Sequence, residues 1–340
     1  MRFKIVHGAF GALEGRCSHV AWPGSSETER LTRWRSVRVV AVAAAVVAWG
    51  MGISAARACS VCQCGDPLAP VGTGKLDAGQ AQLGLQYEML TARARSDDDP
   101  RFTESLTQMM LRPVFVFSPW TTLTAVVQIP IVYKDWSAGT EGFSATHFKP
   151  TGLGDVDLGA RFFLFDRKNL DNFSRQRLAI SAGSSLPTGE NDAQASGVRI
   201  EDHAQLGIGA LAPYAGVLYA YGQDPWNFFG SLSGRLPLTN AYGYRYGSAL
   251  LWSMNVEYRL LDGLSFGLGM DGRYARRDIH DGELQPNTGG LVLAAMPVLK
   301  VGFSEELWLN FKAQLPILTH LFGEQSVGPT LTASVQYTFH

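Results

Sequence analysis

The chain has 340 residues, of which 17% are charged and 46% hydrophobic, and its formal net charge is −1. A net charge this close to zero gives no reason to expect a nucleic acid or an acidic substrate as partner. Soluble domains usually carry about 25% charged residues, so the charged fraction of this chain is low for a soluble protein. With 37 glycines, 11% aromatic residues and no helix-length apolar span after the N-terminal region, the composition favours a β-barrel.

The first predicted element is an export signal within residues 1–58. A basic stretch over 33–38 precedes an uncharged run over 39–56, and Ala56 and Ala58 lie three and one positions before Cys59. A basic region, an apolar region and a small-residue cleavage site form a secretory signal. A membrane anchor is the alternative, but the run is near the lower length limit for a span and weakly apolar. Residues 1–32 fit neither interpretation, and a misassigned start would explain them.

The segment 59–78 is predicted to be a short periplasmic stretch with the motif C-x-x-C-x-C at Cys59, Cys62 and Cys64. In an oxidising compartment such thiols pair, so a disulfide such as Cys59–Cys62 is our first interpretation. No histidine follows Cys62, which disfavours covalent haem attachment. Three cysteines fall short of the four ligands of a structural zinc site. A soft-metal site and a lipid anchor at Cys59 stay open, and apart from such a metal we expect no cofactor.

Residues 79–340 are predicted to form a single closed antiparallel transmembrane β-barrel of about twelve strands. The segment 80–90 alternates apolar residues such as Leu83, Leu85 and Tyr87 with polar ones such as Gln86 and Glu88. Segments 248–259, 264–277 and 307–317 alternate in the same way. This period of two fits strands with lipid on one side and water on the other, whereas a helix repeats every 3.6 residues. A soluble sandwich also alternates, but the long apolar faces with aromatic ends favour a barrel.

Connection lengths provide a second test of the barrel, because bacterial barrels alternate short periplasmic turns with longer outer loops. The expected strands are 79–95, 101–117, 121–134, 154–165, 176–187, 204–221, 225–237, 246–260, 264–277, 287–301, 306–317 and 329–339. The expected long connections are 135–153, 188–203, 238–245, 278–286 and 318–328. This order places both termini in the periplasm. The stretch 166–176 is long for a periplasmic turn, and 96–100 is short for an outer loop.

Two local features qualify the strand assignment. Pro113, Pro130 and Pro237 interrupt the pattern, and each missing N–H must then fall at a bulge or a strand end. The chain ends in an alternating apolar strand over 331–339 with Phe339 near its end, followed by His340. A terminal strand of this kind resembles the assembly signal of outer-membrane barrels, and an ordinary edge strand is the alternative.

Four stretches carry a family resemblance: TGLGDVDLGARFFLF (151–165), SSLPTGEN (184–191), HAQLGIGALAPYAGVLYAY (203–221) and NAYGYRYGSALLWSMNVEYRL (240–260). They resemble the outer-membrane barrel family labelled "MetA-pathway of phenol degradation", whose members are described as transporters. The resemblance runs from about Gly79 to the end of the chain and leaves out the cysteines. It implies a transport barrel, without establishing phenol as the substrate.

No motif points to an enzyme. The histidines at 147, 203, 280, 320 and 340 are scattered, and G-x-S-x-G and H-E-x-x-H are absent from the sequence. The chemistry is expected in the lumen instead, where alternation places charges of both signs. These candidates are Glu88, Asp157, Arg161, Arg235, Glu257, Arg259, Asp271, Arg273 and Lys312. They could set solute passage or pair across a narrow lumen to fill space.

The sequence therefore predicts an exported outer-membrane channel for passive passage of small solutes, hydrophobic or aromatic ones among them. Its expected partners are membrane lipid and a small-molecule solute, with no nucleic acid. The alternative is a structural or metal-linked barrel that docks a periplasmic partner through its cysteine-rich N-terminus.

Overall fold

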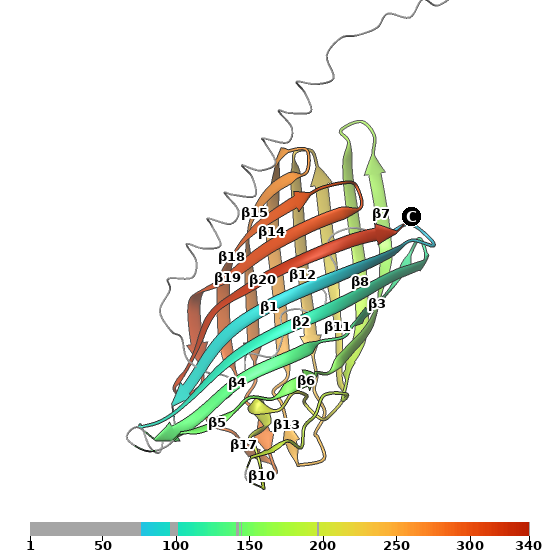
Figure 1. Cartoon of the computed structure of the whole chain (residues 1–340). Helices are drawn as coiled ribbons and strands as arrows, with labels where there is room; N and C mark the ends of the chain where they lie inside the picture. Colours follow the sequence, from blue (N-terminus) through green and yellow to red (C-terminus); the bar gives the residue numbers. More distant parts are fainter. Residues whose placement is uncertain (1–75, 96–100, 141–142, 144, 196, 340) are drawn as a thin grey trace, which may run out of the picture. The chain divides into compact units, whose positions relative to one another are not determined.

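The computed structural model describes residues 76–95, 101–140, 143, 145–195 and 197–339. The predicted export signal and Cys59, Cys62 and Cys64 lie outside these residues. Nearly all regular structure in the described chain is β-strand (Figure 1). No helix among the described residues is long and apolar enough to cross a membrane.

A closed antiparallel β-barrel of twelve strands forms the body of the described chain, as the alternation predicted (Figure 1). Its wall consists of β1 (Ala81–Arg95), β2 (Phe102–Trp120), β3 (Leu123–Gln128), β4 (Ile131–Thr140), β7 (Val156–Asn169), β8 (Ser174–Leu186), β11 (Ala212–Gln223), β12 (Trp226–Arg235), β14 (Ala249–Leu261), β15 (Leu264–Ala275), β18 (Gly290–Gly302), β19 (Leu307–Leu321) and β20 (Gln325–Phe339). Strands β3 and β4 both pair with β2 and together form one interrupted strand. Pairing of β1 with β20 closes the ring, so no edge is left there to aggregate.

The two faces of the wall differ as the alternation predicted. In β1, Leu83, Leu85 and Tyr87 are 49%, 41% and 41% exposed, whereas Gln86 and Glu88 are each 7% exposed. The apolar side chains therefore point outward, where lipid would cover them, and the polar ones point into the lumen. Two exposed aromatic pairs lie on the outer face, at the end of the barrel where β20 finishes. The ring centroids are 4.8 Å apart in both Trp226–Tyr258 and Tyr337–Phe339.

Connections are short at the end that holds the start of β1 and the end of β20. The stretch 166–176, which looked too long for a turn, is largely strand, because β7 runs to Asn169 and β8 begins at Ser174. At the opposite end, β8 and β11 are joined by residues 187–211, β12 and β14 by 236–248, and β15 and β18 by 276–289. Short elements lie in these connections: β9 (Gln194–Ala195), β10 (Val198–Arg199), the 3-10 helix η2 (Asp202–Ala204), β13 (Tyr244–Arg245), β16 (Ile279–His280) and β17 (Glu283–Leu284).

Three predicted boundaries were wrong. The expected long loop 135–153 is mostly strand, because β4 continues to Thr140 and pairs with β5 (Thr146–Phe148) and β6 (Thr151–Leu153). It therefore extends the wall. The expected loop 318–328 is also largely strand, since β19 reaches Leu321 and β20 begins at Gln325. Conversely, 204–211 was predicted as strand and belongs to the connection before β11.

The wall is interrupted at a place where two prolines lie on neighbouring strands. Pro130 lies between β3 and β4, and Pro113 lies in β2 opposite this break. The Ile129 amide donates to the Pro113 carbonyl and the Gly154 amide donates to the Pro130 carbonyl. The missing proline donors thus fall at an irregularity in the sheet, as predicted. Pro237 follows the end of β12, which also agrees with the prediction.

Candidate functional site: the lumen and the segment across its mouth

Residues 187–211, here called the lumen segment, fold onto the inner face of the barrel. Their apolar side chains Ala193, Ile200 and Ala204 pack in one buried cluster with Leu90, Ala92, Leu106, Trp136 and Ala138. Those wall residues belong to β1, β2 and β4 and alternate with outward-facing neighbours. The lumen segment therefore lies inside the barrel, against the wall formed by β1, β2 and β4.

Polar side chains hold the lumen segment at this wall. Lys134, on the inner face of β4, donates to the carbonyls of His203, at 2.8 Å, and of Gln205. Gln205 is 2% exposed, and its amide group bonds the backbone of Ala193 and Ile200 within the segment. Buried polar groups need such partners, so these bonds specify one arrangement of the segment.

The two ends of the lumen segment meet at the interruption in the wall. Asp155, between β6 and β7, accepts hydrogen bonds from the Gly189 amide at 3.0 Å and the Ile208 amide at 2.7 Å. A Cβ atom added at Gly189 would lie 2.7 Å from the Cα of Gly207. The backbones approach so closely that only glycine fits there. Asp155 thus anchors both ends of the segment to the wall.

The other side of the lumen segment contacts the connection 236–248. The Tyr246 hydroxyl donates to the Asp202 carbonyl at 2.7 Å, and the Asn240 amide group donates to the Asp202 carboxylate and the Ile208 carbonyl. Arg199 binds the same carboxylate through two nitrogens, at 2.8 and 3.1 Å. This hydrogen bonding raises the pKa of Arg199, because it favours the charged guanidinium. Arg199 therefore stays charged and paired with Asp202.

A second buried carboxylate continues this network to the connection 276–289. Asp278 accepts from the Tyr244 hydroxyl at 2.7 Å and from the Gly247 amide at 2.7 Å. Burial, followed by nearby carboxylates, raises the pKa of Tyr244 and of Tyr246 well above the usual range. Both phenols therefore remain neutral donors at any working pH.

The lumen segment consequently crosses the mouth of the barrel. It contacts β1, β2 and β4 on one side, and through Tyr244 and Tyr246 it contacts the connections that follow β12 and β15. In the ring of strands, β14 and β15 lie far around the barrel from β1 and β2. Figure 1 shows β10, β13 and β17 gathered at this same end of the barrel.

Most of the charged residues predicted for the lumen lie on the inner face of the wall. Glu88, Asp157, Arg161 and Glu257 are at most 9% exposed. Arg235, Asp271, Arg273 and Lys312 also occupy inward positions and are half-buried. Arg259 is different, because it lies at the end with short connections, is exposed, and pairs with Asp224 at 3.2 Å.

Several of these charged residues form ion pairs or hydrogen bonds. Such pairing is the alternative to setting solute passage that the sequence left open. Glu257 bonds Lys300 at 2.6 Å and accepts from Asn255 at 2.6 Å. Asp271 lies 3.7 Å from Lys312. Asp157 accepts from the Ser185 hydroxyl, which in turn accepts from Arg235 at 2.6 Å. Apart from Arg259, the predicted residues thus lie along the inner face of the barrel wall.

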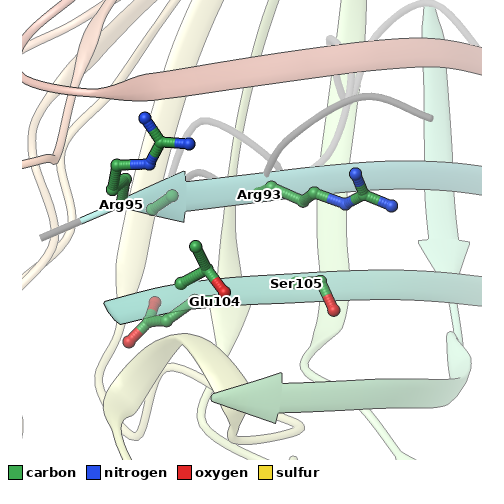
Figure 2. Close-up of a pocket in the computed structure, with 6 residues that line it drawn as sticks. Arg93, Arg95, Glu104 and Ser105 are labelled. Atoms are coloured by element: carbon green, nitrogen blue, oxygen red, sulfur yellow. The ribbon is translucent and has the colours of Figure 1, made fainter. Parts of the chain in front are cut away.

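A cavity of about 310 Å³ lies at the outer ends of β1 and β2. Figure 2 shows Arg93 and Arg95 on one strand and Glu104 and Ser105 on its neighbour. Glu104 points to the inner side and shares a hydrogen bond with Glu201 of the lumen segment. Two carboxyl groups can share a hydrogen bond only if one of them holds a proton.

Sequence reasoning missed the residues that fix the lumen segment, among them Lys134, Asp155, Asp202 and Gln205. One signal was present: the four stretches with the family resemblance contain Asp155, Gly189, Ile208 and Tyr244, which the structure brings together. We interpreted these stretches as ordinary strands and turns. Among the described residues no group of three or more His, Cys, Asp or Glu side chains could hold a metal ion.

No family model and no curated protein matches the sequence. Among solved structures, an outer membrane channel from Pseudomonas putida F1 is similar with a TM-score of 0.60 and 16% identity, over 79% of this chain and 99% of the channel. The transport unit of the autotransporter AIDA-I from Escherichia coli is similar with a TM-score of 0.46 and 8% identity, over 80% of this chain and 94% of the other. At these identities the likeness concerns the fold alone. The class that the fold defines is a closed antiparallel β-barrel of twelve strands.

Proposed function

We propose that this protein is an outer-membrane channel, and not an enzyme, for the passive passage of small solutes. The observation that carries this proposal is a barrel with a lipid-compatible exterior and a charged, polar inner face. Such an inner face is needed for a water-filled path and is not needed for anchoring. The lumen segment would restrict this path at the mouth.

The end with long connections would face the outside of the cell, with both termini in the periplasm, as is usual for bacterial barrels. A solute would then meet the lumen segment first. Movement of the segment would uncover the apolar wall at Leu90, Leu106 and Trp136, which supports hydrophobic or aromatic groups among the solutes. The polar inner face follows further along the path.

Conductance in planar lipid bilayers tests the proposal. The purified full-length protein should shift its mobility on gel electrophoresis when heated, which shows that the barrel is folded, and should give discrete current steps. Liposomes that contain it should swell in a small sugar such as arabinose. A folded barrel that gives neither current nor swelling would refute the channel and leave the fold intact.

A further inference from the structure

We infer that the lumen prefers anions, and that the solutes of the proposed channel include small organic carboxylates. This inference rests on the proposed function, since it names the substrate class of the same lumen. It starts from arginines that five different wall strands point inward. These lumen arginines are Arg112 on β2, Arg161 on β7, Arg177 on β8, Arg235 on β12 and Arg273 on β15.

The inward position of the lumen arginines follows from burial and alternation. Arg112 and Arg161 are 4% and 3% exposed, although each lies on a strand whose alternate residues face the exterior. The other three occupy inward positions on their strands. A guanidinium group stays charged at every pH at which proteins function. The five positive charges are therefore permanent.

Most acidic groups on the inner face already have a different cation beside them. Glu257 pairs with Lys300 at 2.6 Å and Asp271 lies 3.7 Å from Lys312. Asp166 binds Arg175 through two hydrogen bonds of 2.6 and 2.7 Å. These three acid–base pairs each sum to zero charge.

Near the mouth, Glu104 of β2 and Lys134 of β4 add one acidic group and one cation to the inner face. Glu88 and Asp157 are then the acidic groups left on the inner face of the described wall strands to offset the five lumen arginines. Further contacts among these groups would leave the sum unchanged, because an ion pair moves no charge out of the lumen. The inner face is positive in total, although the whole chain has a formal net charge of −1. A low-dielectric wall concentrates this field in the lumen, where it attracts anions and repels cations.

The chemistry of the arginines adds a preference for carboxylates. Guanidinium groups bind carboxylates through two parallel hydrogen bonds. A small carboxylate with an apolar body would also suit the apolar wall near Trp136 and Leu106 at the mouth. The mouth opposes this preference in charge, because the lumen segment carries Glu190, Asp192 and Glu201. Anion selectivity of the channel would show that the charges of the lumen, and not those of the mouth, set the selectivity.

Reversal potentials in planar bilayers test the inference with the full-length protein. Under a potassium chloride gradient, we expect chloride to be more permeant than potassium. With chloride on one side and benzoate on the other, we expect a measurable benzoate current. The double substitution Arg112→Gln and Arg161→Gln should bring the chloride-to-potassium permeability ratio down toward unity, and Arg112→Lys with Arg161→Lys should preserve it because the charges remain.

The matched control is Arg167→Gln with Arg259→Gln, which removes two exposed charges at the end with short connections and should leave the selectivity unchanged. Heat-dependent gel mobility shows which variants are folded, and the lysine variant keeps the test valid if the glutamine variant does not fold. Cation preference, or equal selectivity in the wild-type and glutamine proteins, would overturn the inference while the channel stands. A folded protein without any current would instead overturn the proposed function.

Discussion

Asp155 is the single residue on which the position of the lumen segment most depends. Its two carboxylate oxygens hold the amides of Gly189 and Ile208, at the two ends of the segment. Hydrogen bonds to a charged group contribute about 1.5–3 kcal/mol each. We expect Asp155→Ala to loosen the segment while the wall, which has its own ladders, stays folded.

Two measurements check this expectation. Trypsin should cleave the Asp155→Ala protein after Arg199 faster than the wild type, and single-channel current should fluctuate more. Asp262→Ala, which changes an exposed acid in a short turn, should alter neither. Unchanged cleavage and current in Asp155→Ala would show that the other contacts hold the segment without this anchor.

Glu104 makes the mouth sensitive to pH. It lies beyond the apolar stretch of β2's outer face, which covers 109–117, and therefore outside the membrane-spanning part of the strand. Burial, and then Glu201, raise its pKa from 4.5 to about 8. A raised pKa means that the folded protein favours the neutral acid, so the associated stability is present at low pH and is lost as pH rises from about 4.5 to 8.

Above about pH 8 Glu104 is ionised, so the hydrogen bond that it shares with Glu201 is lost and coulombic repulsion between the two side chains takes its place. We therefore expect current through the wild-type channel to increase as the pH is raised from 7 to 9. Glu104→Gln keeps a hydrogen-bond donor and cannot titrate, so its current should vary less over that interval. Parallel pH profiles for the two proteins would contradict this account.

At the scale of elements, the lumen segment can be removed without cutting the wall. The Gly207 amide donates to the Glu190 carbonyl at 3.0 Å, so the two ends of the segment already lie side by side. Replacing 191–206 by two glycines should therefore close the gap without strain. We expect a heat-modifiable barrel with a larger unitary conductance, since the element across the mouth is gone.

Glu283→Gly, at the tip of the connection 276–289, is a suitable control, because this residue is exposed and distant from Asp155 in the sequence. Its conductance should match that of the wild type. If deletion of 191–206 leaves conductance unchanged, the narrowest part of the path lies elsewhere in the lumen.

The strands could be predicted from sequence because each wall strand satisfies a local rule. Leu85 and Gln86 must face lipid and water whatever else the chain does, so period-two alternation is sufficient. The lumen segment follows no such rule. Residues 203–211 are mostly apolar and glycine-rich and resemble the wall strand that follows them, but 204–208 are all buried.

For the candidate site, the sequence predicted which side chains face inward but not which partners they bind. Alternation predicted inward positions for Glu257 and Asp271 because parity along one strand decides the face, and in the structure Glu257 is buried and Asp271 half-buried. Their partners Lys300 and Lys312 lie on other strands, and cross-strand register sets those pairs. Anchors such as Lys134 and Asp155 bind segments far away in the sequence, and no local pattern marks such contacts.

For the whole molecule, the proposal of a membrane channel depends on which face of the barrel wall contacts lipid. Leu85 and Gln86 are neighbours in β1, one outward at 41% exposed and one inward at 7%. Leu85→Arg would place a cation among acyl chains and should lower the free energy of unfolding by about 2–4 kcal/mol, as for cations near the midplane of other barrels. Gln86→Arg places the same charge in the lumen, next to Glu88, and should cost much less.

Denaturant unfolding in lipid vesicles measures both costs on one strand and at one depth. The comparison removes the effect of the arginine side chain itself, so the difference between the variants reports its surroundings. If the barrel were a soluble one with an apolar interior, the order of the two costs would be the same. Burial of Leu85 against protein would then make its substitution a core defect in any solvent, and the difference would persist in the absence of lipid. Dependence of the Leu85→Arg cost on the thickness of the bilayer therefore separates a membrane barrel from every other way of burying the same side chain.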